Sequence, residues 1–136
     1  MKNIVISVFL FLIMLLSYSL SYASCFKEGD KVNVTGQLKK EFFYGPPGWG
    51  EEPEHDKKLT YWILTLDKPF TCVIEANNSQ NEWGKNIQLI MGEKEYERYR
   101  QFMNKHVSIT GRLFLAQTGY HMTPVLLDSI SSIAFK

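Results

Sequence analysis

The chain has 136 residues, with 15 Lys or Arg against 14 Asp or Glu, so its formal net charge is +1. Lys2 lies in the N-terminal segment that we expect to be removed, and without it the balance is 15 − 1 = 14 basic residues against 14 acidic ones. Proteins that bind nucleic acids through phosphate contacts usually carry a basic excess, so the composition argues against nucleic acid as a partner.

The N-terminus has the pattern of a secretory signal peptide. Lys2 precedes the apolar run Ile4–Leu16, and "SYA" at Ser21–Ala23 supplies the small residues that a signal peptidase recognises. We therefore predict a signal peptide over residues 1–23 and a single domain over residues 24–136, which is long enough for one hydrophobic core. Processing as a lipoprotein at Cys25 is an alternative, although Tyr22 stands where that pattern prefers an aliphatic residue.

Two cysteines, Cys25 and Cys72, remain after such cleavage. An even number of cysteines in an exported chain favours a disulfide bond, because the compartment is oxidising. A lipidated Cys25 would leave Cys72 without a partner, so we do not expect membrane anchoring unless that alternative holds.

Several segments have the composition of β-strands. In Lys31–Phe43, Val32, Val34 and Leu38 alternate with polar residues, as in a half-buried strand. Five further segments are rich in β-branched, aliphatic or aromatic residues: Leu59–Leu66, Thr71–Ala76, Asn86–Met91, His106–Gln117 and Pro124–Phe135.

The segment Gly92–Lys105 changes to a helical period. Tyr96, Tyr99, Phe102 and Met103 share one face of a helix of about three turns, and we expect that face to pack into the core.

Two strand segments repeat one pattern, "VNVTGQL" from Val32 and "VSITGRL" from Val107. A glycine at the same place in both predicts a strand that bends there to pass around a small barrel. The element order predicts a mainly β fold: an OB-like five-stranded barrel with one α-helix between the third and fourth barrel strands. A β-sandwich with one helix would give a similar order.

The stretches "CFKEGDKVNVTGQL", "YWILTLDKPFTCV" and "TGYHMTPVLL" together resemble a family of small exported bacterial domains of unknown function with a TG-x-H-x-TPVLL motif. The resemblance implies a Gram-negative periplasmic location and a disulfide between Cys25 and Cys72, but no activity. Members tend to have more than one histidine in this motif. Here Tyr120 and Met122 flank His121 alone, which argues against a metal site.

Two connections contain the candidate ligand-binding residues. Tyr120 and His121 lie between the last two strands, and Tyr44 and Trp49 lie in the long segment Glu41–Lys58 between the first two. In OB-type barrels these two connections flank the usual binding face. His121 has two interpretations: with Tyr120 it contacts a ligand, or it hydrogen-bonds to a backbone carbonyl and holds the hairpin in place.

No sequence motif specifies a reaction, and we predict no catalytic residues, metal or cofactor. We expect a periplasmic, non-enzymatic domain that binds a protein through its two long loops, such as a cell-envelope component or a secreted toxin. A module that binds a small molecule or a glycan is one alternative. A metal-dependent hydrolase is another, because His121 lies in an exposed connection.

Overall fold

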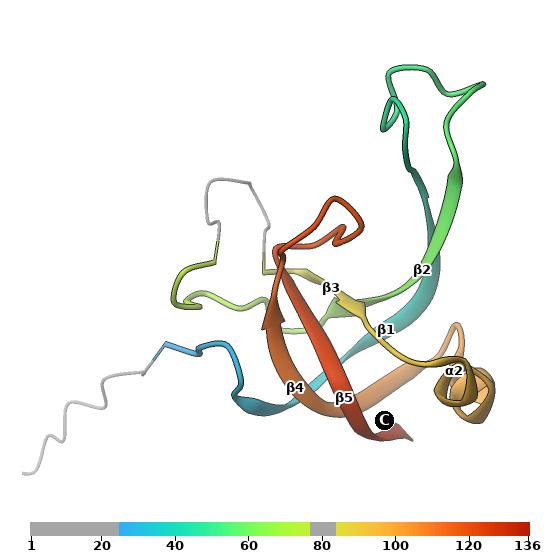
Figure 1. Cartoon of the computed structure of the whole chain (residues 1–136). Helices are drawn as coiled ribbons and strands as arrows, with labels where there is room; N and C mark the ends of the chain where they lie inside the picture. Colours follow the sequence, from blue (N-terminus) through green and yellow to red (C-terminus); the bar gives the residue numbers. More distant parts are fainter. Residues whose placement is uncertain (1–24, 77–83) are drawn as a thin grey trace, which may run out of the picture.

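The computed structural model describes residues 25–76 and 84–136 (Figure 1), and the predicted signal peptide lies outside these ranges. Neither helical segment in this part of the chain has the length and hydropathy of a membrane-spanning helix. The elements, in chain order, are β1 (Lys31–Tyr44), β2 (Lys58–Leu66), β3 (Asn86–Leu89), α2 (Glu93–Tyr99), the 3₁₀ turn η1 (Arg100–Phe102), β4 (His106–Leu115) and β5 (Val125–Phe135).

The five strands form one mixed sheet that closes into a ring. Their order is β1-β2-β3-β5-β4, and β4 pairs with β1 to close it. The β3–β5 pair is parallel and the other four pairs are antiparallel. The prediction of a mainly β fold, with a helix between the third and fourth strands, is confirmed.

β1 pairs with two neighbours because it changes partner at a glycine. Lys31–Gln37 pair with β4, and Gly36–Tyr44 pair with β2. A Cβ atom on Gly36 would collide with the carbonyl oxygen of Thr65, so the two backbones approach closely only because residue 36 has no side chain. Gly111, its counterpart in β4, lies at a register shift against β5. The two glycines of the repeated pattern thus lie where β1 changes partner and where β4 shifts register.

The prediction of a strand over Thr71–Ala76 is wrong. This segment forms only an isolated bridge, in which Val73 pairs with Phe26. Two constraints remove it from strand geometry: Cys72 is bonded to Cys25, and Glu75 has a φ of 64°. The segment still contributes an apolar side chain to the core, since Val73 is only 2% exposed.

The helix is shorter than predicted, but its apolar face packs as expected. It ends at Tyr99, is followed by η1, and the chain then turns at Asn104 with a φ of 60°. Tyr99 and Phe102 are buried in the core, and Tyr96 and Met103 pack against it from partly buried positions. Tyr96 lies edge-on to Trp62 of β2, with 5.1 Å between ring centroids.

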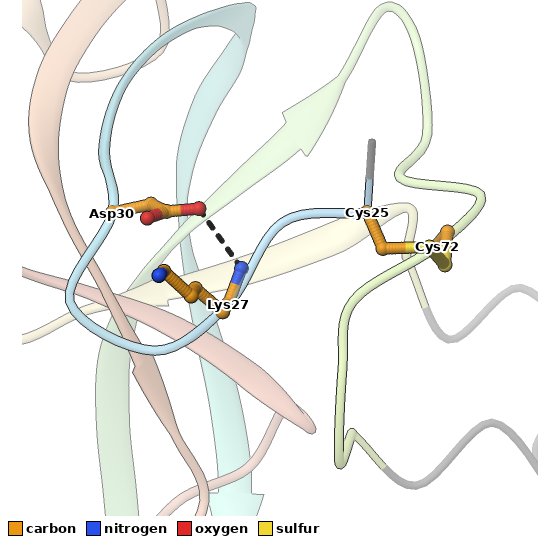
Figure 2. The surroundings of a disulfide bond; sticks show 4 residues. All are labelled: Cys25, Lys27, Asp30 and Cys72. Atoms are coloured by element: carbon orange, nitrogen blue, oxygen red, sulfur yellow. Dashed lines mark hydrogen bonds between the residues drawn. A yellow bond between two sulfur atoms is a disulfide. The ribbon is translucent and has the colours of Figure 1, made fainter. Parts of the chain in front are cut away.

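The predicted disulfide between Cys25 and Cys72 is present (Figure 2). It joins residues 47 apart in the sequence and attaches the N-terminal segment to the β2–β3 connection. Backbone hydrogen bonds continue the attachment, from Phe26 N to Cys72 O at 3.1 Å and from Ile74 N to Phe26 O at 2.8 Å. Closing a loop of this length stabilises the fold by about 4 kcal/mol in the chain-entropy model.

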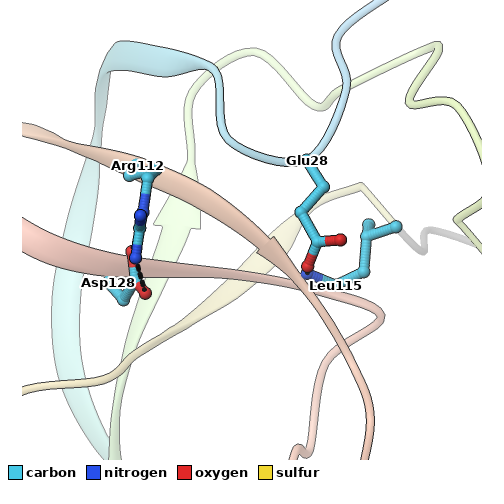
Figure 3. Close-up of polar contacts among 4 residues, drawn as sticks. All are labelled: Glu28, Arg112, Leu115 and Asp128. Carbon is cyan, nitrogen blue, oxygen red and sulfur yellow. Dashed lines mark hydrogen bonds and ion pairs between the residues drawn. The ribbon is translucent and has the colours of Figure 1, made fainter.

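A bidentate ion pair joins β4 to β5 beside the register shift (Figure 3). Arg112 Nε and Nη2 donate to the two carboxylate oxygens of Asp128 at 2.9 and 2.8 Å. The same strand is held at its end by the side chain of Glu28, which accepts the N–H of Leu115 at 3.2 Å.

Replacing Phe102 by alanine should lower the free energy of unfolding by about 3–5 kcal/mol, because truncating a buried ring leaves a cavity. Chemical denaturation measures the loss. Reversing the charge of the exposed Glu97 is the matched control, and it should change stability by only about 0.5 kcal/mol or less. Equal and small effects in both variants would contradict the packing of this helical face.

Asp128 should make stability depend on acid pH. The hydrogen bonds from Arg112 lower the pKa of Asp128 below its ordinary 3.8, although partial burial acts in the opposite direction. The folded state therefore holds this carboxylate ionised at lower pH than the unfolded chain does. Its contribution is present above about pH 3.8 and is lost as the pH falls through the folded pKa. We expect Asp128→Asn to lower the melting temperature by about 3 °C at pH 7 and by less at pH 2, whereas Glu51→Gln should change neither.

Candidate functional site

The β1–β2 loop, residues 45–57, is organised around the carboxylate of Asp56. This side chain is buried and accepts the N–H of Gly48 at 2.6 Å and the N–H of Gly50 at 2.7 Å. Burial of the carboxylate raises its pKa, but the N–H donors of Gly50 and Gly48 outweigh burial and keep the pKa below its ordinary value. The loop therefore folds around an ionised group.

Trp49 lies between these two glycines and projects from the loop. Its φ of 54° is in the left-handed region, and its N–H donates to Gly45 O at 3.0 Å. The indole is 44% exposed, which is high for a large apolar side chain held by an ordered backbone. The hydrogen bonds to Asp56 on either side thus hold an exposed tryptophan in one place.

The β4–β5 loop, residues 116–124, is held in part by His121. Its Nδ1 accepts the N–H of Gln117 at 2.8 Å and that of Thr118 at 3.4 Å. The backbone N–H of His121 donates to Thr118 O at 3.1 Å, and the ring packs edge-on against Phe114. The ring thus holds its own loop, as in the second interpretation, but it does so by accepting backbone N–H groups and not through the expected backbone carbonyl.

Gln88 of β3 holds the other half of this loop. The side chain is fully buried, with Nε2 donating to Tyr120 O at 3.2 Å and Oε1 accepting Met122 N at 2.6 Å. Its backbone N–H donates to Thr123 Oγ1 at 3.0 Å. Sequence reasoning missed Gln88, because a glutamine within "NIQL" gives no sign that a distant loop will cover it.

The two loops meet through their aromatic side chains. The rings of Trp49 and Tyr120 lie 5.4 Å apart at 67°, and Tyr120 is 45% exposed. The edge of the Trp49 indole also lies over Gly119, where an added Cβ would be 3.0 Å from two of its ring atoms. Of the four predicted residues, the structure thus brings Trp49 and Tyr120 into contact, while the His121 ring packs against Phe114.

Tyr61 lies near this contact, whereas Tyr44 lies on the other face of the β1–β2 pair, because Tyr44 pairs with Lys58 and Tyr61 pairs with Glu41. Tyr44 is 37% exposed and packs edge-on against Phe42 at 4.9 Å, at the base of the β1–β2 loop. Tyr61 of β2 lies near Tyr120: burial raises the pKa of the Tyr61 phenol, and the Tyr120 phenol raises it further. We define the loop surface as Trp49, Tyr61 and Tyr120.

Neither of two hollows described here lies at the loop surface. One, of about 530 Å³, lies between α2 and the β1–β2 pair and is lined by Lys40, Thr60, Trp62, Glu93, Tyr96, Glu97 and Arg100. The other lies beside the first half of β1. Within residues 25–76 and 84–136, no three His, Cys, Asp or Glu side chains are grouped as a metal site would need. The other two histidines lie apart from each other: His106 pairs with Asp67, and His55 lies beside Glu52.

A family model matches the C-terminal part of the chain. Residues 86–134 match the family described as Domain of unknown function (DUF4431). No curated protein and no solved structure matches the chain. The matched range runs from β3 into β5, so it includes Gln88, Tyr120 and His121, whereas Trp49 and both cysteines lie outside it.

Replacing Gln88 by methionine should detach the β4–β5 loop while leaving the ring folded. The N–H of Met122 loses its acceptor, and an unsatisfied buried donor costs about 1–3 kcal/mol. We expect the Trp49 indole N–H resonance, assigned by comparison with Trp49→Phe, to shift towards its value in Tyr120→Ala. Gln117→Met, an exposed change in the same loop, is the control. An unchanged Trp49 resonance in Gln88→Met would show that Gln88 does not position the loop.

Proposed function

We propose that this chain is an exported, periplasmic domain with an OB-like barrel that binds a protein through its loop surface and is not an enzyme. The OB-like assignment is supported by the strand order β1-β2-β3-β5-β4, the parallel β3–β5 pair and the helix before β4. The proposed export rests on the N-terminal sequence, and the Cys25–Cys72 disulfide is consistent with an oxidising compartment.

The observation that carries the proposed binding site is the contact between Trp49 and Tyr120. It joins the two loops that flank the binding face of OB-type barrels, and both rings remain nearly half exposed. Exposed Trp and Tyr side chains on an ordered backbone are typical anchors of protein interfaces, since little side-chain entropy is lost when they bind.

Two features favour a protein over a glycan or small molecule. The hollows of about 600 and 530 Å³ are lined by other residues, so neither gives the loop surface the concave shape typical of a small-ligand site. In addition, the Trp49 and Tyr120 rings meet at 67°, and the edge of one therefore occupies the face of the other. A sugar ring stacks best on an unobstructed aromatic face.

The charge of the β1–β2 loop indicates the chemistry of the partner. Glu51, Glu52 and Glu54 lie within five residues after Trp49 and are all exposed. A partner that accepts Trp49 should therefore offer an apolar pocket bordered by Lys or Arg side chains, because complementary charge speeds association and sets orientation. His121 acts on this surface through the loop that it holds. Because its Nδ1 already accepts two N–H groups, we do not propose a metal-dependent hydrolase.

The test is a pull-down from periplasmic extract with residues 24–136 as bait, followed by titration of the purified partner. Trp49→Ala and Tyr120→Ala should each weaken binding about thirtyfold, which corresponds to about 2 kcal/mol for an interface anchor. Ile74→Ala, which removes an exposed apolar side chain of the β2–β3 connection, should bind as the unmodified domain does.

Two results would contradict the proposal. One is equal affinity of both loop variants and the unmodified domain for the partner. The other is Trp49-dependent binding on a glycan array with no protein captured, which would support the glycan alternative. Both variants must have melting temperatures near that of the unmodified domain, so that a loss of binding is due to the loop surface and not to unfolding.

A further inference from the structure

A second candidate site lies beside the first half of β1, away from the residues of the loop surface. A groove of about 600 Å³ separates this half of the strand from the segment that follows β2. Its lining includes Lys31, Val32, Asn33, Leu66, Lys68 and Phe70. Its volume is in the range of protein binding pockets, about 300–1,000 Å³.

The groove exists because β2 leaves β1 early. Gly36 pairs with Leu66, and one further hydrogen bond runs from Asp67 N to Thr35 O at 3.0 Å. Pro69 would lie opposite Asn33 if the pairing continued, but its nitrogen carries no hydrogen to donate. The chain instead diverges towards Cys72, which is bonded to Cys25 (Figure 2).

This divergence leaves one edge of β1 without a paired strand. Leu38 N donates to Lys105 O and Leu113 N donates to Asp30 O, so even-numbered residues of this strand direct their backbone groups towards β4. Backbone direction alternates along a strand. Within the described part of the chain, no strand pairs with this edge between Lys31 and Thr35.

The walls beside this edge are apolar on one side and basic on the other. Val32, Leu66 and Phe70 are buried members of the core that also line the groove. Lys31 and Lys68 are exposed and line it from the solvent side. Asn33 points to the same side, but its amide is occupied by Thr110 and Ser108 at 2.7 and 2.9 Å.

We propose that this groove binds an extended segment of a partner protein, which adds a strand to the edge of β1 at Lys31–Thr35. The segment would alternate apolar residues, facing Val32, Leu66 and Phe70, with acidic residues, facing Lys31 and Lys68. Main-chain hydrogen bonds supply affinity in this mode of recognition, and the alternating side chains supply specificity. An apolar small molecule fits less well, because it would leave the backbone groups of Lys31 and Asn33 without partners.

A synthetic peptide tests this proposal with the full mature domain. The probe is acetyl-Glu-Val-Glu-Val-Glu-Val-amide carrying a fluorescent label, and its binding is followed by anisotropy and by backbone amide NMR. We expect saturable binding that slows hydrogen exchange at the N–H groups of Lys31 and Asn33. Two versions of the peptide carry N-methyl groups on alternate amides, one in each register. The version whose methyl groups face β1 should bind at least about tenfold more weakly than the other.

A charge exchange provides the matched control. Lys31→Glu combined with Lys68→Glu should weaken binding of the Glu–Val peptide at least about tenfold and should favour a Lys–Val peptide of the same length. Trp49→Ala should bind the Glu–Val peptide as the unmodified domain does, which separates this site from the proposed loop surface.

Three results would overturn the proposal: no saturable binding at 1 mM peptide, equal binding of parent and N-methylated peptides, or unchanged hydrogen exchange at Lys31 and Asn33. Equal binding of the parent and the N-methylated peptides would indicate an apolar pocket for a small molecule.

Discussion

The ring closes because β1 approaches β2 at a point where a side chain would not fit. At Gly36 the strand stops pairing only with β4 and begins to pair with β2, and its Cα lies against the carbonyl of Thr65. Any side chain there would push the two strands apart and open the sheet. The change of partner also lets the second half of β1 and β2 extend together as a hairpin, which carries the β1–β2 loop away from the ring (Figure 1).

The same change of partner leaves the first half of β1 with one unpaired edge. A strand that pairs on both sides along its full length would leave no groove between Lys31 and Thr35. The ring and the groove thus share one cause. β1 pairs first with β4 and then with β2, and it pairs with both strands only at residues 36 and 37. The disulfide then fixes the far side of the groove by attaching Cys72 to the N-terminal segment.

The sequence predicted the features that depend on periodicity and composition. Alternation in β1, the aromatic face of the helix and the two bend glycines are local patterns, and the structure bears them out. The strand predicted over Thr71–Ala76 does not form, because a disulfide and a positive φ at Glu75 override strand propensity. Neither constraint has a local signature in the sequence. Gln88 was missed for a similar reason, as its partners lie more than 30 residues away.

The loop surface depends on side chains that do not reach solvent themselves. Asp56 holds the backbone on both sides of Trp49, and Gln88 holds the backbone on both sides of His121. The exposed rings therefore have fixed positions before any partner arrives, which reduces the entropy lost on binding. The match over residues 86–134 includes Gln88 and its loop but neither Asp56 nor Trp49. The two halves of the surface thus come from different parts of the chain. A domain that keeps only the matched half would present Tyr120 without the indole that packs against it, and its loop would offer a partner one aromatic anchor instead of two.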